Sequence, residues 1–180
     1  MQSQNGDRRS CPAMTHRHIS DVSVKAFFAW ENGVRLRYRL EIARPGSSGK
    51  TTCVVMQNPS YANEEVADKS VQFMEKVVFE KGFQEFAGVS RLIVVNQFAR
   101  VQTNGFRGLP EEIGAENDLA IREALRESDI VVIGWGSSNR FEDRKAYVLG
   151  LLQDMPQKLV LKTRMHPSRG RYDGFIQSFR

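Results

Sequence analysis

Cysteine and histidine are scarce in this sequence. Its 180 residues include two cysteines, Cys11 and Cys53, and three histidines. Two cysteines are too few for a disulfide framework, a four-cysteine zinc site or a thiolate-held iron–sulfur cluster. His16 and His18 lie in a polar N-terminal stretch, where we expect a solvated tail and not a metal site. We therefore expect no metal and no cofactor, and we expect Cys53 to be a small buried residue.

Long apolar runs and nucleotide-binding loops are also missing. No stretch approaches the roughly 18 apolar residues that cross a membrane, and the charged N-terminus lacks the apolar segment of a secretory signal. We therefore expect a cytoplasmic protein with no membrane partner. Gly49-Lys50-Thr51 precedes the first parallel strand instead of following it, and Gly134-Trp135-Gly136 is too short for a dinucleotide fingerprint. No serine lies in a G-x-S-x-G elbow.

Positive charge is in excess. The formal net charge is +5, and several arginines follow predicted strands or lie near the C-terminus, including Arg140, Arg169 and Arg171. An excess of basic groups favours a polyanionic partner such as DNA. For any single arginine, a role in solvating the surface is the simpler interpretation.

The pattern of apolar residues predicts one domain over residues 21–180, preceded by a loosely attached arm over residues 1–20. Residues 23–43 alternate apolar and polar side chains around Glu31-Asn32-Gly33, which predicts an antiparallel hairpin. Four apolar strands then alternate with helices expected at residues 65–81, 110–127 and 141–153. The four strands are expected at Thr51–Met56, Ser90–Asn96, Asp129–Gly134 and Lys158–Leu161.

This alternation predicts an α/β fold. We expect a three-layer α/β/α domain with a central four-stranded parallel sheet and an added N-terminal β-hairpin, present as a monomer. Ligands bind at the carboxyl ends of the strands in such sheets. The residues that follow the four strands therefore mark the candidate site.

Each of the four predicted strands ends in polar side chains. The four stretches are Gln57-Asn58-Pro59-Ser60-Tyr61, Asn96-Gln97-Phe98, Gly134 to Arg140 with Ser137, and His166-Pro167-Ser168-Arg169-Gly170-Arg171. Turns are commonly rich in these residue types. Ordinary turns can therefore explain the polar residues at one or two of the strand ends. Amide, imidazole and guanidinium groups converging on one sheet edge are typical of a functional site.

In this order, the strand ends resemble those of the uracil-DNA glycosylase superfamily. The resemblance is carried by Gln57-Asn58-Pro59, Val95-Asn96, Ile133 to Gly136 and His166-Pro167-Ser168. Over roughly residues 37–170, the chain is also similar to a family of small, uncharacterised bacterial and phage proteins. The motifs shared with that family are "NPS", "G-x-E-N-D" at Gly114 to Asp118, and "H-P".

The glycosylase resemblance implies hydrolysis of the N-glycosidic bond of a flipped-out damaged or modified base. It assigns Asn58 to positioning the attacking water and His166 to stabilising the departing base. It assigns Asn96 to reading the base edge, with Gln57 beside it. Tyr61 and Phe98 are the candidates for stacking on the base. Because an amide is a poor base, we expect a slower enzyme than one with aspartate at position 58.

The DNA phosphates would be held by the hydroxyl and guanidinium groups of the strand ends. These DNA-binding candidates are Ser60, Ser137, Arg140, Ser168, Arg169 and Arg171. Asp68 is first a helix N-terminal acid and only second a catalytic group. Similarity to phage-associated proteins points to modified phage DNA, and hence to a role in defence.

Two other functions stay open. One is a nucleic-acid-binding protein without catalysis, and the other is a hydrolase of free nucleosides or nucleotides. We place no catalytic lysine in the pocket, so we expect a monofunctional glycosylase with no Schiff-base step.

Overall fold

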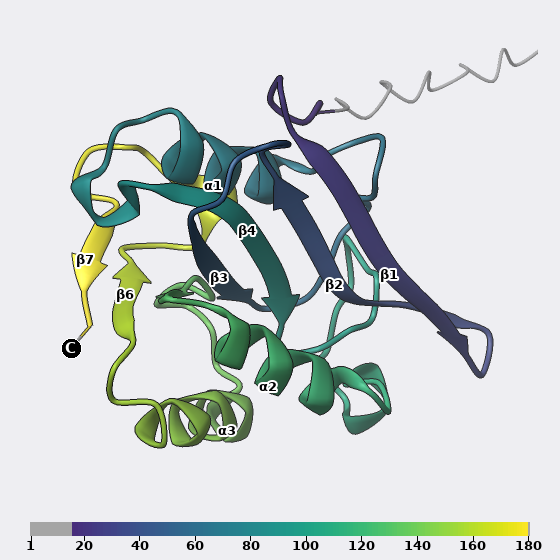
Figure 1. The fold of residues 1–180 in the computed structure, drawn as a ribbon. Coiled ribbons are helices and arrows are strands. Elements are labelled where there is room, and N and C mark those ends of the chain that lie inside the picture. The colour runs from purple at the N-terminus through teal and green to yellow at the C-terminus, as the bar shows by residue number, and fades with distance from the viewer. Residues whose placement is uncertain (1–15, 180) are drawn as a thin grey trace, which may run out of the picture.

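A single sheet crosses the protein in the computed structural model, which describes residues 16–179 (Figure 1). Within those residues the sheet has seven strands in the order β1-β2-β4-β3-β5-β6-β7. The strands are β1 (Ser23–Glu31), β2 (Val34–Ala43), β3 (Lys50–Met56), β4 (Val89–Asn96), β5 (Ile130–Ile133), β6 (Leu159–Thr163) and β7 (Ile176–Ser178).

The central four strands are parallel, as the sequence predicts. β4, β3, β5 and β6 are neighbours in that order and run in the same direction. The sheet is nevertheless wider than the predicted four strands. β2 of the hairpin pairs antiparallel with β4, and β7 pairs antiparallel with β6. The hairpin is therefore part of the main sheet and brings its side chains to the edge at which β4 ends.

The hairpin turn follows from two residues that tolerate positive φ. Asn32 has φ 49° and Gly33 has φ 76°, and together they form the two-residue connection between β1 and β2. Positive φ at both central residues is the type I′ turn, whose twist matches that of the paired strands. The predicted turn at Glu31-Asn32-Gly33 is confirmed.

Helices cover both faces of the sheet. The α-helices of the described residues are α1 (Lys69–Phe79), α2 (Asn117–Glu127) and α3 (Glu142–Gln153). α1 lies on one face, and α2 and α3 lie on the other (Figure 1). Val54 and Leu92 pack toward Val71 and Met74 of α1, whereas Cys53 and its neighbours face the α2–α3 layer. The burial of Cys53 is complete and raises the pKa of its thiol to about 12.

The first predicted helix begins later than its apolar spacing indicated. Instead of spanning residues 65–81, α1 spans Lys69–Phe79. The Asn63 side chain accepts hydrogen bonds from the backbone of Glu65 and Val66, which holds those residues in a turn. Asp68 then caps the helix, because its Oδ1 accepts from the Val71 N–H at 2.9 Å. The expectation that Asp68 is a helix N-terminal acid is confirmed.

The second predicted helix is divided. Residues 110–127 contain a short 3₁₀ turn at Pro110–Glu112 and then α2 from Asn117. Gly114 separates them with φ 88°, and a Cβ there would lie 2.9 Å from the Tyr38 ring. Asn117 donates to the carbonyl oxygens of Asn96 and Gln97, each at 3.1 Å. The Gly114 to Asp118 motif is thus a structural element that holds the end of β4.

Residues 16–19 pack against the domain. Met1–Thr15, with Cys11 and most of the predicted arm, lie outside the described residues. His18 Nδ1 is hydrogen-bonded to the buried Glu75, and His18 Nε2 bonds to the Asn63 carbonyl at 2.8 Å. The Ile19 N–H donates to the second Glu75 oxygen at 3.0 Å. His18 therefore has a structural role in place of the expected solvated one.

Replacing His18 by alanine is expected to lower the free energy of unfolding by roughly 1–3 kcal/mol, because buried Glu75 loses a partner. Burial opposes protonation of His18, but the hydrogen bond and charge of Glu75 outweigh it and raise its pKa. The stabilisation is therefore full below the unfolded pKa of about 6.5 and is lost as pH rises through the folded value. Thermal unfolding of wild type and His18→Ala at several pH values measures this; a difference that grows toward alkaline pH contradicts it.

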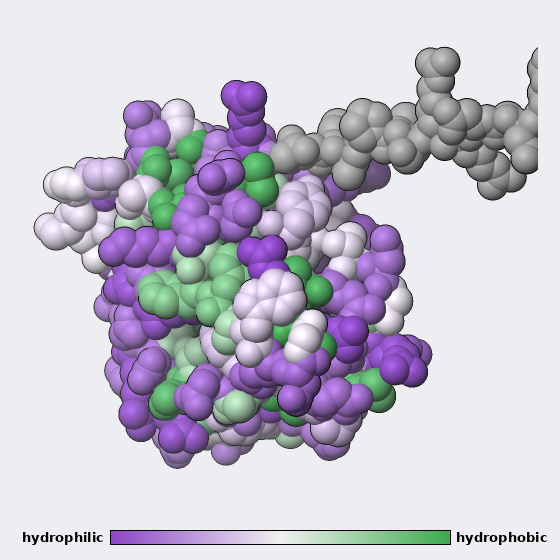
Figure 2. Space-filling model, turned by 90° about the vertical axis from the view of Figure 1, so that its right-hand side faces the viewer, coloured by the Kyte–Doolittle hydropathy of each residue, from purple (hydrophilic) through white to green (hydrophobic). Residues whose placement is uncertain are grey.

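The side of the molecule that carries β1 exposes several apolar side chains. Figure 2 looks onto this side and shows apolar surface surrounded by hydrophilic residues. Phe27 and Trp30 of β1 are exposed, and so is Leu119 of α2. Among residues 16–179, no helix has the length and apolar character required to span a membrane.

Candidate active site at the carboxyl ends of the parallel strands

A cavity of about 480 Å³ lies at the carboxyl ends of the parallel strands. Asn58 comes from the end of β3, Trp135 follows β5, and His166 follows β6. The first turn of α1 closes another side of the cavity with Lys69 and Ser70. This volume is in the range of small-molecule sites, roughly 300–1,000 Å³. The expected convergence of strand ends therefore produces a real pocket.

The Asn58 amide is held in one orientation. Its Nδ2 donates to the Gln102 carbonyl at 2.7 Å and to the Pro59 carbonyl at 3.2 Å. Its Oδ1 accepts a longer bond, 3.3 Å, from Gln57 Nε2. With the NH₂ group occupied by two carbonyls, the oxygen is the group left to accept from a ligand. Asn58 is thus suited to accept a hydrogen bond from water.

A second amide layer supports Gln57. Asn139 is buried, and its Nδ2 donates to Gln57 Oε1 at 3.2 Å and to Gln97 Oε1 at 2.7 Å. Its own Oδ1 accepts from the Phe141 N–H at 3.1 Å. Asn139 therefore sets the orientation of Gln57, which in turn contacts Asn58. The sequence prediction did not include Asn139 among the site residues, because only the folded chain places it under the end of β3.

The His166 ring has a defined tautomer. The Ser168 backbone N–H donates to Nδ1 at 3.2 Å, and the Ser168 hydroxyl lies 2.9 Å from the same nitrogen. Since Nδ1 accepts, the proton of the neutral ring lies on Nε2. Burial and the nearby Arg169 charge lower the pKa of His166, although Asp68 acts in the opposite direction. His166 therefore offers a neutral N–H donor at neutral pH.

Gly136 allows the β5 loop to approach His166. Its φ is 77°, and a Cβ at this position would lie 2.6 Å from the His166 backbone nitrogen. Both the left-handed conformation and the lack of space favour glycine here. The fragment Gly134-Trp135-Gly136, which only partly matches a nucleotide-binding loop, is thus the place where the β5 loop packs closely against His166.

Replacing Gly136 by alanine is expected to cost about 1–2 kcal/mol of stability for the left-handed backbone alone. Because the added methyl group must displace His166, any activity that uses this imidazole should fall by up to about 10²-fold. Gly150→Ala is the matched control, since Gly150 lies in α3 and a Cβ there meets no atom within 4 Å. Equal activity of the two variants would contradict the prediction.

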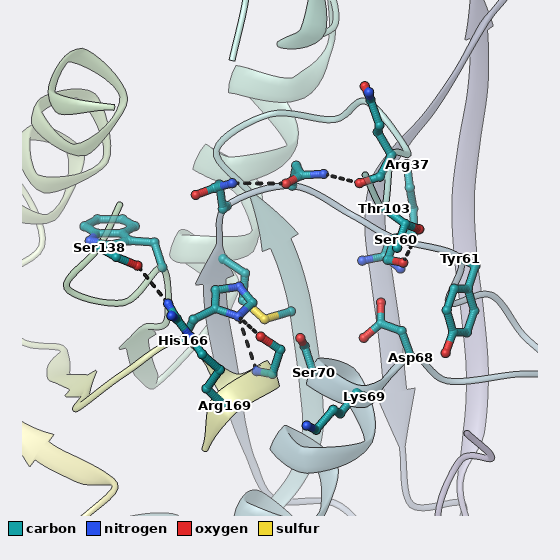
Figure 3. Close-up of a pocket in the computed structure, with 16 residues that line it drawn as sticks. Arg37, Ser60, Tyr61, Asp68, Lys69, Ser70, Thr103, Ser138, His166 and Arg169 are labelled. Carbon is teal, nitrogen blue, oxygen red and sulfur yellow. Dashed lines mark hydrogen bonds between the residues drawn. The ribbon is translucent and has the colours of Figure 1, made fainter. Parts of the chain in front are cut away.

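Several other predicted residues also line the cavity. Gln57, Tyr61, Ser60, Ser168 and Arg169 are part of its wall. The hydroxyl groups of Ser60 and Thr103 are 2.8 Å apart, and Arg169 Nη2 donates to the Ser138 hydroxyl at 2.9 Å (Figure 3). These hydroxyl and guanidinium groups lie at the exposed rim. Asp68 lines the same cavity in addition to capping α1.

Asn96 and Phe98 are not part of the cavity wall. Asn96 is completely buried, and its Oδ1 accepts from Arg37 Nη2 at 3.4 Å. Phe98 packs in edge-to-face contacts with Phe106 and Phe141, at centroid distances of 5.1 and 4.9 Å. The geometry therefore offers no direct route from either side chain to a ligand in this cavity. Asn96 is instead a support for Arg37.

Ser137, Arg140 and Arg171 also lie outside the cavity wall. All three are exposed, and Arg140 borders a separate depression next to Phe141. The neighbouring residue Ser138, and not Ser137, lines the cavity. Periodicity places the loop after β5 at the correct edge but does not say which of its serines borders the cavity.

Eight wall residues were missed as site residues by sequence reasoning. They are Arg37, Met56, Lys69, Ser70, Gln102, Thr103, Trp135 and Ser138. Arg37 comes from the hairpin, whose attachment to β4 the alternation pattern does not reveal. Trp135 lies within the Gly134-Trp135-Gly136 fragment, and its place in the wall provides an aromatic surface that Phe98 does not. Lys69 is an exposed lysine in the cavity wall, and the prediction that no catalytic lysine lies in the pocket stays a prediction.

No metal site is evident in the part of the chain that the structure describes. Residues 16–179 contain no cluster of three or more His, Cys, Asp or Glu side chains arranged to hold a metal ion. The polar groups of the cavity wall are amides, one imidazole, hydroxyl groups, cations and one carboxylate.

A family model described as "Protein of unknown function (DUF1643)" matches residues 37–169. No curated protein matches the chain. The matched stretch begins at Arg37 and ends at Arg169, so it contains every residue of the cavity wall.

Proposed function

The chain belongs to the DUF1643 family, and we propose that it is a monofunctional DNA glycosylase. The reaction is hydrolysis of the bond between a sugar and a damaged or modified base that has left the helix stack. The family match itself assigns no activity. The proposal rests on the resemblance of the strand ends to uracil-DNA glycosylases and on the geometry of the cavity.

One observation carries the proposal. The same cavity contains an amide oxygen with its orientation set by the protein, at Asn58, and a neutral imidazole with its proton on Nε2, at His166. Glycosidic cleavage builds positive charge on the sugar and negative charge on the base. An acceptor for the attacking water and a donor for the departing base are the two groups that this charge separation requires.

The reaction then follows from these two groups. The Asn58 oxygen accepts a hydrogen bond from water and directs the water oxygen at C1′ of the sugar. The C1′–nitrogen bond breaks, its electron pair stays with the base, and the His166 Nε2–H donates a hydrogen bond to that negative charge. The water oxygen becomes the hydroxyl on C1′, and a water proton reaches the base through solvent. An abasic site remains in the DNA.

The charges around the cavity favour an anionic strand. Lys69, Arg169 and Arg37 line it, against the single carboxylate of Asp68. Lys69 and Arg169 are exposed at the rim (Figure 3), where the flanking phosphates would lie. A free nucleoside would not require these rim cations, which favours the glycosylase over a nucleoside hydrolase.

The position of Lys69 does not change the proposal of a monofunctional enzyme. Nucleophilic lysines are activated by desolvation or by a neighbouring cation, and Lys69 is an exposed side chain. Borohydride treatment during the reaction is therefore expected to trap no covalent protein–DNA adduct. Recovery of such an adduct, and its loss in Lys69→Gln, would make the enzyme a glycosylase with lyase activity.

Incubation with defined oligonucleotides tests the function. The panel carries uracil, alkylated bases, 5-hydroxymethylcytosine or glucosylated cytosine, in single-stranded and duplex form. We expect alkali-labile abasic sites with at least one base. Tight DNA binding without any abasic site would support the non-catalytic binder. Hydrolysis of free nucleosides alone would support the nucleoside hydrolase.

A further inference from the structure

One end of the cavity holds a buried arginine that has no acidic partner in contact. Arg37 is 1% exposed; its Nη1 donates to the Ala62 carbonyl at 2.9 Å, and its Nη2 makes the 3.4 Å bond to Asn96. Its Nε has no hydrogen-bond partner, and among the described residues no carboxylate forms an ion pair with this guanidinium. Buried arginines are normally paired. Arg37 lines the cavity, and its guanidinium carries more N–H groups than these two hydrogen bonds use.

Asp68 lies at the same end of the cavity. Figure 3 shows the Arg37 and Asp68 side chains together with Tyr61, separate from His166 and Ser138. The Asp68 carboxylate is 7% exposed, and the bond from Val71 N–H occupies its Oδ1. The Asp68 charge raises the pKa of Arg37, while burial lowers that pKa more strongly, to about 10. Arg37 and Asp68 thus bring opposite charges to the space at this end of the cavity.

The two charges select what can fill that space. A phosphate group would be attracted by Arg37 but repelled by the carboxylate of Asp68. A neutral group with an acceptor and a donor side by side satisfies both, because Arg37 only donates and an ionised aspartate only accepts. The edge of a nucleobase has this character.

Amino bases fit this arrangement better than oxo bases. In cytosine, the exocyclic amino group adjoins a ring nitrogen acceptor, so a carboxylate and a guanidinium can bind neighbouring atoms. In uracil and thymine, the one ring N–H lies between two carbonyl oxygens. A carboxylate that accepts from that N–H therefore also faces a carbonyl lone pair.

We propose that Arg37 and Asp68 form a base-reading pair that selects a base with an exocyclic amino group beside a ring acceptor, as in cytosine, over its deaminated counterpart. Asp68 accepts from the amino group, and Arg37 donates to the adjacent acceptor. This inference rests on the proposed function, since it names the kind of base that the glycosylase receives. It replaces Asn96 as the reader of the base edge and makes Asn96 the support of Arg37.

The test compares two bases that differ only at the read position. Oligonucleotides carrying one 5-hydroxymethylcytosine or one 5-hydroxymethyluracil are used to measure both single-turnover excision and equilibrium binding. Wild type is expected to prefer the amino base by about tenfold to a hundredfold, as for one well-placed base contact. Asp68→Asn is expected to lose or reverse this preference, because its amide can donate to the oxo group.

Two variants separate base reading from folding. Asparagine and serine are both good helix N-caps, so Asp68→Asn and Asp68→Ser should keep α1 intact, which thermal unfolding checks. Asp68→Ser should bind the two oligonucleotides equally. Equal treatment of both bases by wild type, or an unchanged preference in both folded variants, would overturn the inference. A binding preference that these variants lose, without excision of any base, would support the inference while the glycosylase proposal failed.

Discussion

Alanine at position 166 is expected to reduce base excision by about 10²–10³-fold, the range seen when one donor to a developing negative charge is removed. His166 is the only imidazole in the described cavity wall, and its Nε2 carries the proton because Ser168 N–H donates to Nδ1. Substrate binding should change little, since the groups proposed to hold the phosphates lie at the rim and not at His166. Single-turnover excision at saturating enzyme measures the chemical step.

A second histidine provides the control. His16 is described in the structure but does not line the cavity, so His16→Ala should excise the base at the wild-type rate. The pH profile gives another check. Because burial and Arg169 lower the pKa of His166, its neutral form persists below the ordinary histidine value of about 6.5. A steep fall of the excision rate between about pH 8 and pH 6.5 in wild type, absent in His166→Ala, would contradict the neutral donor.

Alanine at position 58 is expected to reduce excision by about 10²-fold or more, because the attacking water loses the group that positions it. The informative variant is Asn58→Asp. Chemistry alone predicts a faster enzyme, since a carboxylate is the stronger base. The structure predicts no gain, because Asn58 Nδ2 donates to the Gln102 and Pro59 carbonyls and a carboxylate there would face two oxygens that cannot donate.

The aspartate variant should also show a characteristic pH dependence. Carbonyl neighbours favour the protonated carboxyl, so the folded pKa of residue 58 in Asn58→Asp is expected to rise above the unfolded value of about 3.9. Stability relative to wild type is then lost as pH rises through that folded pKa. Thermal unfolding between about pH 4 and pH 8 measures this loss. Gln177→Ala, which removes an exposed amide on β7, should match wild type, and a faster Asn58→Asp enzyme would contradict the argument.

The positions of most helices and strands can be predicted from local sequence patterns, and the errors in those predictions have identifiable causes. The hairpin, the four parallel strands and α3 follow from apolar periodicity and from turn residues such as Gly33. The start of α1 was placed too early because periodicity does not register the side-chain bonds of Asn63 and Asp68 to the backbone. The break before α2 depends on a positive φ at Gly114 and its close contact with Tyr38, a residue from the hairpin.

The candidate site was predicted in part. The carboxyl ends of parallel strands share one edge, so Asn58 and His166 had to lie on the same side of the sheet. The direction of the strands does not predict whether a given side chain lines the cavity or is buried in the core. Asn96 and Ser137 lie as close to the predicted strand ends as Asn58 and Ser138 do, yet Asn96 is enclosed in the core and Ser137 is not part of the cavity wall.

The sequence by itself determined the parallel α/β core, the sheet edge that bears the site, and the types of polar group brought to it. These properties depend on periodicity and on the direction of neighbouring strands. The tertiary structure decided the orientation of the Asn58 amide through a carbonyl 44 residues away, the tautomer of His166, and the entry of Arg37 from the hairpin. Each of these depends on long-range packing. That packing decides which hydrogen-bond partners a side chain has and whether it is buried, and no local stretch of sequence specifies either.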